Sequence, residues 1–194
     1  MFPLSCILFA GGKSSRMGED KSLLPFGGYA TLTEFQYERL KKIFSRVCIS
    51  TKNRDKFDFD GDFILDPIDA DFAPTAGFVS TLKALEDERI MVLSVDTPFV
   101  DETVFQTLID ADSPELDAVI AQTSEGSHPM CGIYHRSLLG DFERMLADGD
   151  HRLGKLLSVS KTQYVAFEDE ELFANLNHPH EYQAALSRFC EPNR

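Results

Sequence analysis

Two patterns of apolar residues alternate along the chain. Short continuous apolar runs predict buried strands, and segments with an apolar residue every three or four positions predict amphipathic helices. The predicted strands cover residues 4–10, 47–49, 63–65, 90–95, 117–121, 131–134 and 164–167. The predicted helices contain residues 32–44, 78–85, 104–109, 138–146 and 182–189, with Thr75 as the expected N-cap of the second.

Continuous apolar strands separated by amphipathic helices are typical of a mostly parallel sheet that is covered on both faces. The fold class expected is therefore α/β: a Rossmann-like three-layer domain with a mostly parallel central sheet and helices on both faces. No repeat, linker or change of composition divides the 194 residues. A chain of this length can bury about 70% of its unfolded surface in one core, so we expect a single domain over residues 1–194.

The charge of the chain excludes some classes of partner. Thirty-two acidic residues against 19 basic ones give a formal net charge of -13. This surplus repels nucleic acids and anionic membranes, so an anionic ligand needs a local cluster of cations. No apolar run reaches the ~20 residues of a membrane span, and no basic residue precedes the apolar N-terminus. We expect a cytoplasmic protein whose four scattered cysteines are buried thiols.

Residues 10–21, which follow the first predicted strand, have the most unusual composition in the chain. They contain glycines that let main-chain amides approach a ligand, and three cations, namely Gly11, Gly12, Gly18, Lys13, Arg16 and Lys21. A Walker A loop would need glycine at position 7, where the chain has Ile7, and no G-x-G-x-x-G is present. An exposed turn with solvated charges is the alternative, but three cations beside three glycines favour a polyphosphate site.

Two aspartates end predicted strands at the same edge of the sheet. Asp96 follows the strand 90–95, and one carboxylate with phosphate oxygens and water is a normal ligand set for Mg²⁺. Asp66 follows the strand 63–65 and could accept hydrogen bonds from a ribose or a base. The alternatives are local: Asp96 could cap the following turn, and Asp66 could form an Asx-turn before Pro67.

These segments carry a resemblance to a known family. Residues 9–21, FAGGKSSRMGEDK, resemble the opening signature of the molybdenum cofactor guanylyltransferases, within the wider nucleotidyltransferase superfamily. Residues 65–77 resemble that family's Asp…Gly-Pro-Leu-x-Gly stretch, 94–98 its metal-binding Asp-x-Pro, and 173–177 its Asn-x-Asn. Residues 127–129 lie where the family often has His-Pro.

The resemblance implies an activity. The family transfers GMP from Mg·GTP to the phosphate of molybdopterin, releasing pyrophosphate and forming the molybdopterin guanine dinucleotide cofactor. It implies a nucleotide-binding half over about residues 1–110 and an acceptor-binding half over about 111–194. Transient contact with proteins that make or receive the cofactor is expected, and the protein itself is expected to be a monomer or a weak oligomer.

The resemblance also implies roles for individual residues. Nucleotide contacts are expected from Phe9, Ala10, Gly11, Gly12, Lys21, Asp66 and Asp96. Catalytic roles are expected for Lys21, Arg16 and Asp96, and Asp96 is expected to hold Mg²⁺. The candidates for acceptor binding are His128, Asn175 and Asn177.

The chain departs from the family pattern at five of the positions compared. Phe9 stands where leucine is usual, and Ser50 where a nucleoside-contacting Asn or Asp is common. Ala73 and Thr75 replace the Gly and Leu of Gly-Pro-Leu-x-Gly, and His178 replaces the Thr that follows Asn-x-Asn.

Other functions remain open on the sequence. A cytidylyltransferase acting on molybdopterin, or a nucleotidyltransferase for a sugar or polyol phosphate, would use the same fold. Residues 10–12, Ala-Gly-Gly, favour guanine, because relatives that use pyrimidines more often have Ala-Ala-Gly. A nucleotide-binding protein without turnover is the rival from another class. It would have less need of both Lys21 and Asp96, because only catalysis requires a cation and a metal at the transition state.

Overall fold

A seven-stranded sheet forms the centre of the protein. The computed structural model describes residues 1–11, 20–67 and 74–190. The strands lie in the order β3 (Phe63–Leu65), β2 (Phe44–Thr51), β1 (Phe2–Phe9), β4 (Arg89–Ser94), β6 (Gly126–His135), β5 (Ala118–Thr123) and β7 (Thr162–Ala166). This order places the first strand of the chain among the inner strands of the sheet.

All neighbouring strands are parallel except at β6. That strand runs antiparallel to both β4 and β5, while β5 and β7 are parallel. The chain adds β2 and β3 on one side of β1 and then returns to add β4 on the other side. The segments that follow β1 and β4 therefore leave the sheet at the point where the strand order reverses. In open α/β sheets this is the place where ligands bind.

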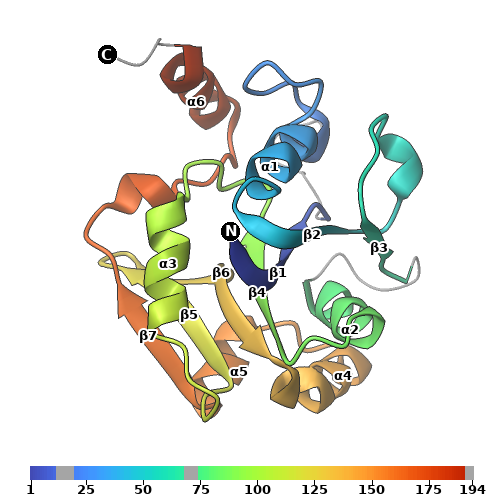
Figure 1. Ribbon diagram of the computed structural model, residues 1–194, viewed down its shortest axis with the longest axis vertical. Coiled ribbons are helices and arrows are strands. Elements are labelled where there is room, and N and C mark those ends of the chain that lie inside the picture. Colours follow the sequence, from blue (N-terminus) through green and yellow to red (C-terminus); the bar gives the residue numbers. More distant parts are fainter. Residues whose placement is uncertain (12–19, 68–73, 191–194) are drawn as a thin grey trace.

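Helices cover both faces of the sheet. One face carries α1 (Leu32–Leu40), α3 (Glu102–Asp110) and α6 (Pro179–Cys190), and the other carries α2 (Pro74–Ala84), α4 (Leu139–Asp148) and α5 (Leu153–Val159). Figure 1 shows α1 and α3 on one side of the strands and α2, α4 and α5 on the other. Four short 3₁₀ helices complete the described elements: η1 (Lys21–Leu23), η2 (Arg54–Lys56), η3 (Arg136–Leu138) and η4 (Glu170–Phe173).

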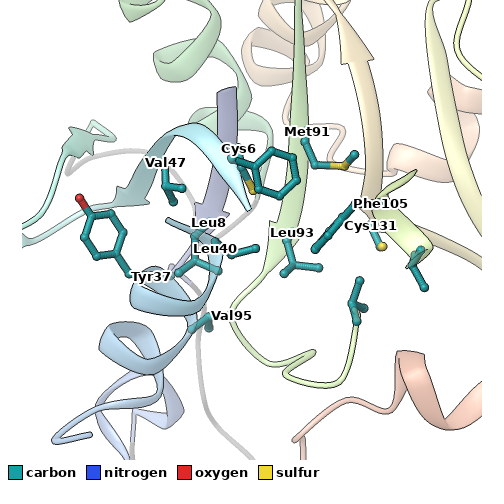
Figure 2. Close-up of a cluster of buried hydrophobic side chains, with 14 of the residues drawn as sticks. Cys6, Leu8, Tyr37, Leu40, Val47, Met91, Leu93, Val95, Phe105 and Cys131 are labelled. Carbon is teal, nitrogen blue, oxygen red and sulfur yellow. The ribbon is translucent and has the colours of Figure 1, made fainter. Parts of the chain in front are cut away.

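The two faces of the sheet bury separate hydrophobic clusters because side chains alternate along each strand. Leu8 of β1 packs in the cluster under α1 and α3, whereas its neighbour Ile7 packs under α2. Figure 2 shows Leu8 and Leu93 of the sheet beside Leu40 of α1 and Phe105 of α3. Strands that are apolar on both faces read as continuous hydrophobic runs in the sequence, which is why they were recognisable there.

The predicted fold class is confirmed: the sheet is mostly parallel, with helices on both faces. Two local expectations are wrong, and one helix was not predicted. The helix predicted over residues 32–44 ends at Leu40, and Phe44 already belongs to β2. Thr75 lies inside α2, which begins at Pro74, so it is not the N-cap. The helix α5 was not predicted, because only three leucines in seven residues mark its buried side.

Cys6, Cys48 and Cys131 are buried free thiols, as expected. In the part of the chain that the structure describes, no helix has the length and apolar character to cross a membrane.

Candidate active site

Polar groups gather where four neighbouring parallel strands end. Asp66 follows β3, Ser50 lies near the end of β2, Ala10 follows β1, and Asp96 follows β4. Neighbouring strands lie ~4.8 Å apart, so this row spans roughly 14 Å, which is the scale of a nucleoside triphosphate. We call this row the carboxyl edge.

Lys21 connects the carboxyl edge to the C-terminal part of the chain. Its Nζ forms an ion pair with Oδ2 of Asp96 and donates a hydrogen bond to Oδ1 of Asn177 at 2.8 Å. The side chains of Lys21 and Asp96 are 18% and 13% exposed. Three residues that the sequence predicts for the site, separated by up to 156 positions, therefore meet at one ammonium group.

The short helix η1 places Lys21. Asp20 is its N-cap, and the carboxylate of Asp20 accepts hydrogen bonds from both the main-chain N and the hydroxyl of Ser22, at 3.0 and 2.6 Å. The carbonyl of Ser22 accepts a bond of 2.8 Å from the hydroxyl of Thr33, which ties η1 to α1. Hydrogen bonds hold η1 at its N-cap and at Ser22, so the backbone of Lys21, its first residue, is fixed in position.

The turn that carries Asp96 is held by two residues that sequence reasoning missed. The amide of Gln36 is fully buried and donates to the carbonyls of Val95 and Thr97, at 3.3 and 3.2 Å, on either side of Asp96. Arg39 in turn donates to Oε1 of Gln36 at 2.6 and 3.1 Å, and burial lowers the pKa of its guanidinium to about 10. A polar pair three positions apart on a helix was the signal available, but it could not reveal which turn it would hold.

Asn177 is fixed from the other side of the site. The carboxylate of Glu181 accepts hydrogen bonds from the main-chain N of Asn177 and of His178, at 2.6 and 2.8 Å, at the start of α6. The main-chain N of Leu176 donates to the carbonyl of Asp96 at 2.9 Å. The C-terminal segment is thus bonded directly to the residue that ends β4.

The main chain at the end of β1 is engaged within the sheet. The carbonyl of Phe9 accepts from Val95 N at 3.0 Å, and Ala10 N donates to the carbonyl of Ser50 at 2.9 Å. The side chains of Phe9 and Ala10 are buried. Gly11 comes next and is exposed, and a Cβ placed there would meet no atom of the described residues within 4 Å. Gly11 is therefore the point where the chain leaves the sheet and its backbone becomes accessible.

A second cluster lies at the β3 end of the carboxyl edge. The hydroxyl of Ser50 is 3.1 Å from both carboxylate oxygens of Asp66. Burial raises the pKa of the Asp66 carboxyl above its usual value, and this effect outweighs the hydrogen bonds from Ser50 and Ser80 and the charge of Lys52. The cluster presents one half-buried carboxyl group with hydrogen-bonding capacity to spare.

Asp66 should therefore reduce stability at neutral pH. A carboxyl with a raised folded-state pKa favours folding below its unfolded value of about 3.8, and this contribution is lost as the pH rises through the folded value. We expect Asp66→Asn to unfold at a higher denaturant concentration than the wild type at pH 7. The difference should shrink as the pH approaches 3.8. A variant that is less stable than the wild type at pH 7 would contradict this account.

Gly77 allows α2 to approach this cluster closely. A Cβ at position 77 would lie 2.6 Å from both the ring of Phe9 and the hydroxyl of Ser50. Phe9 itself packs against Phe78 with ring centroids 5.0 Å apart. The glycine predicted as part of a family motif therefore has a packing role of its own.

Gly77→Ala is expected to lower the free energy of unfolding by about 1–3 kcal/mol, because an added methyl overpacks a buried contact. For a chain of this size that is a fall in Tm of ~2–4 °C per kcal/mol. Gly140→Ala is the matched control: Gly140 also lies in a helix, but a Cβ there meets no described atom within 4 Å. Alanine should leave that variant as stable as the wild type or more so. Equal Tm values for both variants would exclude the packing role of Gly77.

The three residues predicted for acceptor binding line one pocket. His128, Asn175 and Asn177 surround a cavity of about 560 Å³ next to the Lys21–Asp96 pair. The ring of His128 stacks on Phe173 with centroids 4.5 Å apart, and its Nε2 lies 3.1 Å from the hydroxyl of Thr123. Burial lowers the pKa of the His128 imidazole, against the raising effect of Glu125 and Glu170. A pocket with both apolar and polar lining residues, including the stacked rings of His128 and Phe173, thus adjoins the carboxyl edge.

The chain is similar to known proteins over most of its length. Residues 6–166 match the model of the MobA-like NTP transferase domain. The chain belongs to this family. It is 39% identical over 181 residues to the molybdenum cofactor guanylyltransferase of Campylobacter jejuni subsp. jejuni serotype O:6, which covers 93% of this chain and 94% of that protein. It is 30% identical over 188 residues to the protein of the same name from Helicobacter pylori strain G27, which covers 94% and 92%.

A solved structure agrees with the fold of this MobA-like transferase. The molybdopterin-guanine dinucleotide biosynthesis protein A of Archaeoglobus fulgidus superposes with a TM-score of 0.82 over 95% of this chain and 98% of that one. The two sequences are 19% identical, so this likeness supports the fold.

The oxygen groups of the site suit a magnesium ion that takes one ligand from the protein and the others from phosphate and water. Asp96 offers a carboxylate beside the hydroxyl of Ser94, which donates to Oδ1 at 2.5 Å. The described residues contain no group of three or more His, Cys, Asp or Glu side chains that could enclose an ion. One carboxylate, completed by phosphate oxygens and water, is the arrangement that Mg²⁺ favours at nucleotide sites of this kind.

Four residues of the expected polyphosphate site, Gly12, Lys13, Arg16 and Gly18, lie outside the described residues. For all the other predicted site residues the structure gives a position, either at the carboxyl edge or in the adjoining pocket.

Proposed function

We propose that this MobA-like transferase transfers GMP from Mg·GTP to the terminal phosphate of molybdopterin, forming the molybdopterin guanine dinucleotide and releasing pyrophosphate. The relatives at 39% and 30% identity, both named molybdenum cofactor guanylyltransferase, support this activity. The observation that carries it is the position of Lys21, whose ammonium group contacts both Asp96 of the carboxyl edge and Asn177 of the adjoining pocket. A group that touches both substrate regions is what a transfer between them requires.

The nucleotide would lie along the carboxyl edge. The guanosine would occupy the end near Phe9, Ser50 and Asp66, where a half-buried carboxyl can accept from a ribose or a base. The polyphosphate would extend from Gly11 towards Lys21 and Asp96. This assignment divides the domain into a nucleotide half over about residues 1–110 and an acceptor half over about 111–194, since most of the pocket wall comes from residues 123–188.

The chemistry needs alignment and neutralisation of charge. A phosphate oxygen of molybdopterin attacks the α-phosphorus of GTP, a new P–O bond forms, and the bond from the α-phosphorus to the bridging oxygen breaks as pyrophosphate leaves. No covalent bond to the protein is required, so the protein acts by holding the reactants in line and stabilising negative charge. Lys21 would stabilise the negative charge, and the contacts of its ammonium group with Asp96 and Asn177 support this role.

Asp96 would hold Mg²⁺ through its carboxylate. The hydroxyl of Ser94 orients this carboxylate by donating a hydrogen bond to Oδ1. When bound, the ion supplies positive charge to the phosphate oxygens. The Lys21–Asp96 ion pair keeps both groups in place before substrate enters, since each would otherwise be a poorly solvated charge.

The acceptor pocket would receive the pterin. His128 stacked on Phe173 offers a flat wall, and Asn175 and Asn177 offer amide groups that can both donate and accept. The phosphate of molybdopterin would then point towards Lys21, the cation at the boundary of the nucleotide and acceptor regions. Release of the product to proteins that use it, and a monomeric or weakly associating state, remain predictions.

A pyrophosphate-release assay tests the proposal. Purified protein, Mg²⁺ and molybdopterin are combined with GTP, CTP, ATP or UTP in turn, and a sugar phosphate replaces molybdopterin in parallel. We expect pyrophosphate only when both GTP and molybdopterin are present. Equal release with CTP would favour the cytidylyltransferase alternative, and release with the sugar phosphate in place of molybdopterin would overturn the acceptor assignment.

A further inference from the structure

Lys56 joins the two ends of the glycine- and cation-rich segment. It belongs to η2, which lies in the connection between β2 and β3. Its Nζ donates to the carbonyl of Ala10 at 3.2 Å, to Oδ2 of Asp20 at 2.9 Å and to the hydroxyl of Ser22 at 3.0 Å. Ala10 is the first residue of this segment, residues 10–21, and Asp20 lies next to its last residue, so one ammonium group bonds near both of its ends.

The contacts use the full donor capacity of the lysine. An ammonium group has three N–H donors, and three described acceptors surround this one within hydrogen-bond distance. The side chain is 20% exposed and its Nζ also lies 4.9 Å from the ring centroid of Phe57. Five of the eight lysines that the structure describes are exposed, whereas this one is largely buried among oxygens of two other segments.

The effect reaches Lys21 through Asp20. Asp20 is the N-cap of η1, and Lys21 is the first residue of that helix. Burial alone would raise the pKa of the Asp20 carboxyl, but hydrogen bonds from Ser22 and Lys56 and the charge of Lys56 more than offset it and lower the pKa. Asp20 is therefore a carboxylate whose charge is compensated by Lys56, one residue away from the cation that we assign to the phosphates.

We propose that Lys56 is a positioning residue for the nucleotide: it holds the carbonyl of Ala10 and the cap of η1 together, and it neutralises Asp20 so that this carboxylate does not repel the polyphosphate. The inference rests on the proposed function for the identity of the nucleotide. The link between the two chain ends is a separate claim, which does not depend on any ligand.

The test compares two lysine variants. Lys56→Met removes the ammonium and keeps the aliphatic stem. Lys41→Met is the matched control, because Lys41 also has one ion pair, at 3.0 Å to Glu38, and one cation–π contact, at 5.1 Å to Tyr37, but lies away from the segment. In steady-state assays we expect Lys56→Met to raise the KM for GTP about tenfold while the KM for molybdopterin changes less than twofold. Lys41→Met should change neither value by more than twofold.

A second substitution separates positioning from a general loss of stability. In the Lys56→Met protein, Asp20→Asn removes the uncompensated charge but keeps a good N-cap for η1. We expect the KM for GTP of this double variant to be at least threefold lower than that of Lys56→Met. Lys56→Arg, which keeps the charge, should stay within about threefold of the wild-type KM and provides a folded reference if Lys56→Met is unstable.

A measurement without nucleotide tests the link itself. Trypsin cleavage after Lys13 or Arg16, mapped by mass spectrometry, should be at least fivefold faster in Lys56→Met than in the wild type or in Lys41→Met. Equal cleavage rates, or an unchanged KM for GTP in Lys56→Met, would overturn the role of Lys56. If instead the wild type failed to bind Mg·GTP, the proposed function would be overturned, and the cleavage rates would still decide whether Lys56 joins the two ends.

Discussion

Lys21→Ala should lower the turnover number by at least 10²–10³-fold. Removal of one well-placed group that stabilises transition-state charge has an effect of this size. The substitution also leaves Asp96 without its ion-pair partner and Asn177 without its donor. Because the pair is mostly buried but still reaches solvent, we expect a loss of unfolding free energy of only about 1–2 kcal/mol. Single-turnover rates and denaturant unfolding curves measure the two effects separately.

Lys41→Ala serves as the control for Lys21→Ala. It removes a lysine whose ion pair with Glu38 is exposed, and both rate and stability should stay near the wild-type values. Near-native turnover in a folded Lys21→Ala protein would remove this residue from the chemistry.

Asp96→Asn should lower turnover at least 100-fold and raise the Mg²⁺ concentration for half-maximal activity at least tenfold. Asparagine has nearly the size and shape of aspartate, and its one amide oxygen can still accept a hydrogen bond from either Ser94 or Lys21, so the side-chain volume is kept. The amide lacks the negative charge that a Mg²⁺ ligand at a single-carboxylate site needs. Titrations of Mg²⁺ at saturating GTP and molybdopterin give both numbers.

Asp117→Asn provides a close comparison. Asp117 also accepts from a serine hydroxyl, that of Ser137 at 2.7 Å, but it precedes β5 and so lies at the opposite edge of the sheet. Its amide variant should show an unchanged Mg²⁺ titration. If Asp96→Asn behaves in the same way, Asp96 is not the metal ligand.

The sequence predicted the fold class because its evidence is local. Strands buried on both faces must be apolar at every position, and helices beside them must be apolar on one side, so periodicity alone indicates the layers. It failed where local preference and tertiary packing disagree. Ile43 and Phe44 continue a helical spacing, yet Phe44 is fully buried as the first residue of β2, because it packs against Phe2 and Phe105.

The sequence also predicted part of the candidate site, namely the residues that follow strands, but not the residues that hold them in place. Lys21, Asp66 and Asp96 are marked by their places after strands, since the carboxyl ends of parallel strands share one edge. The residues that hold them carry no such mark. Gln36 reaches across 59 positions to Val95, and Lys56 across 36 to Asp20. Which helix residue meets which turn depends on the packing of the helix against the sheet, and that is not encoded in spacing.

Residue order by itself determined that this chain forms a layered α/β sheet with a cationic, glycine-rich segment after its first strand and an aspartate after its fourth. Tertiary structure alone decided that Lys21 lies between Asp96 and Asn177, and that His128, Asn175 and Asn177 share one cavity. The physical reason is the range of the interactions. Periodicity reflects burial between neighbours in the chain, whereas these contacts depend on strand order and on the return of the C-terminal segment to the end of β4.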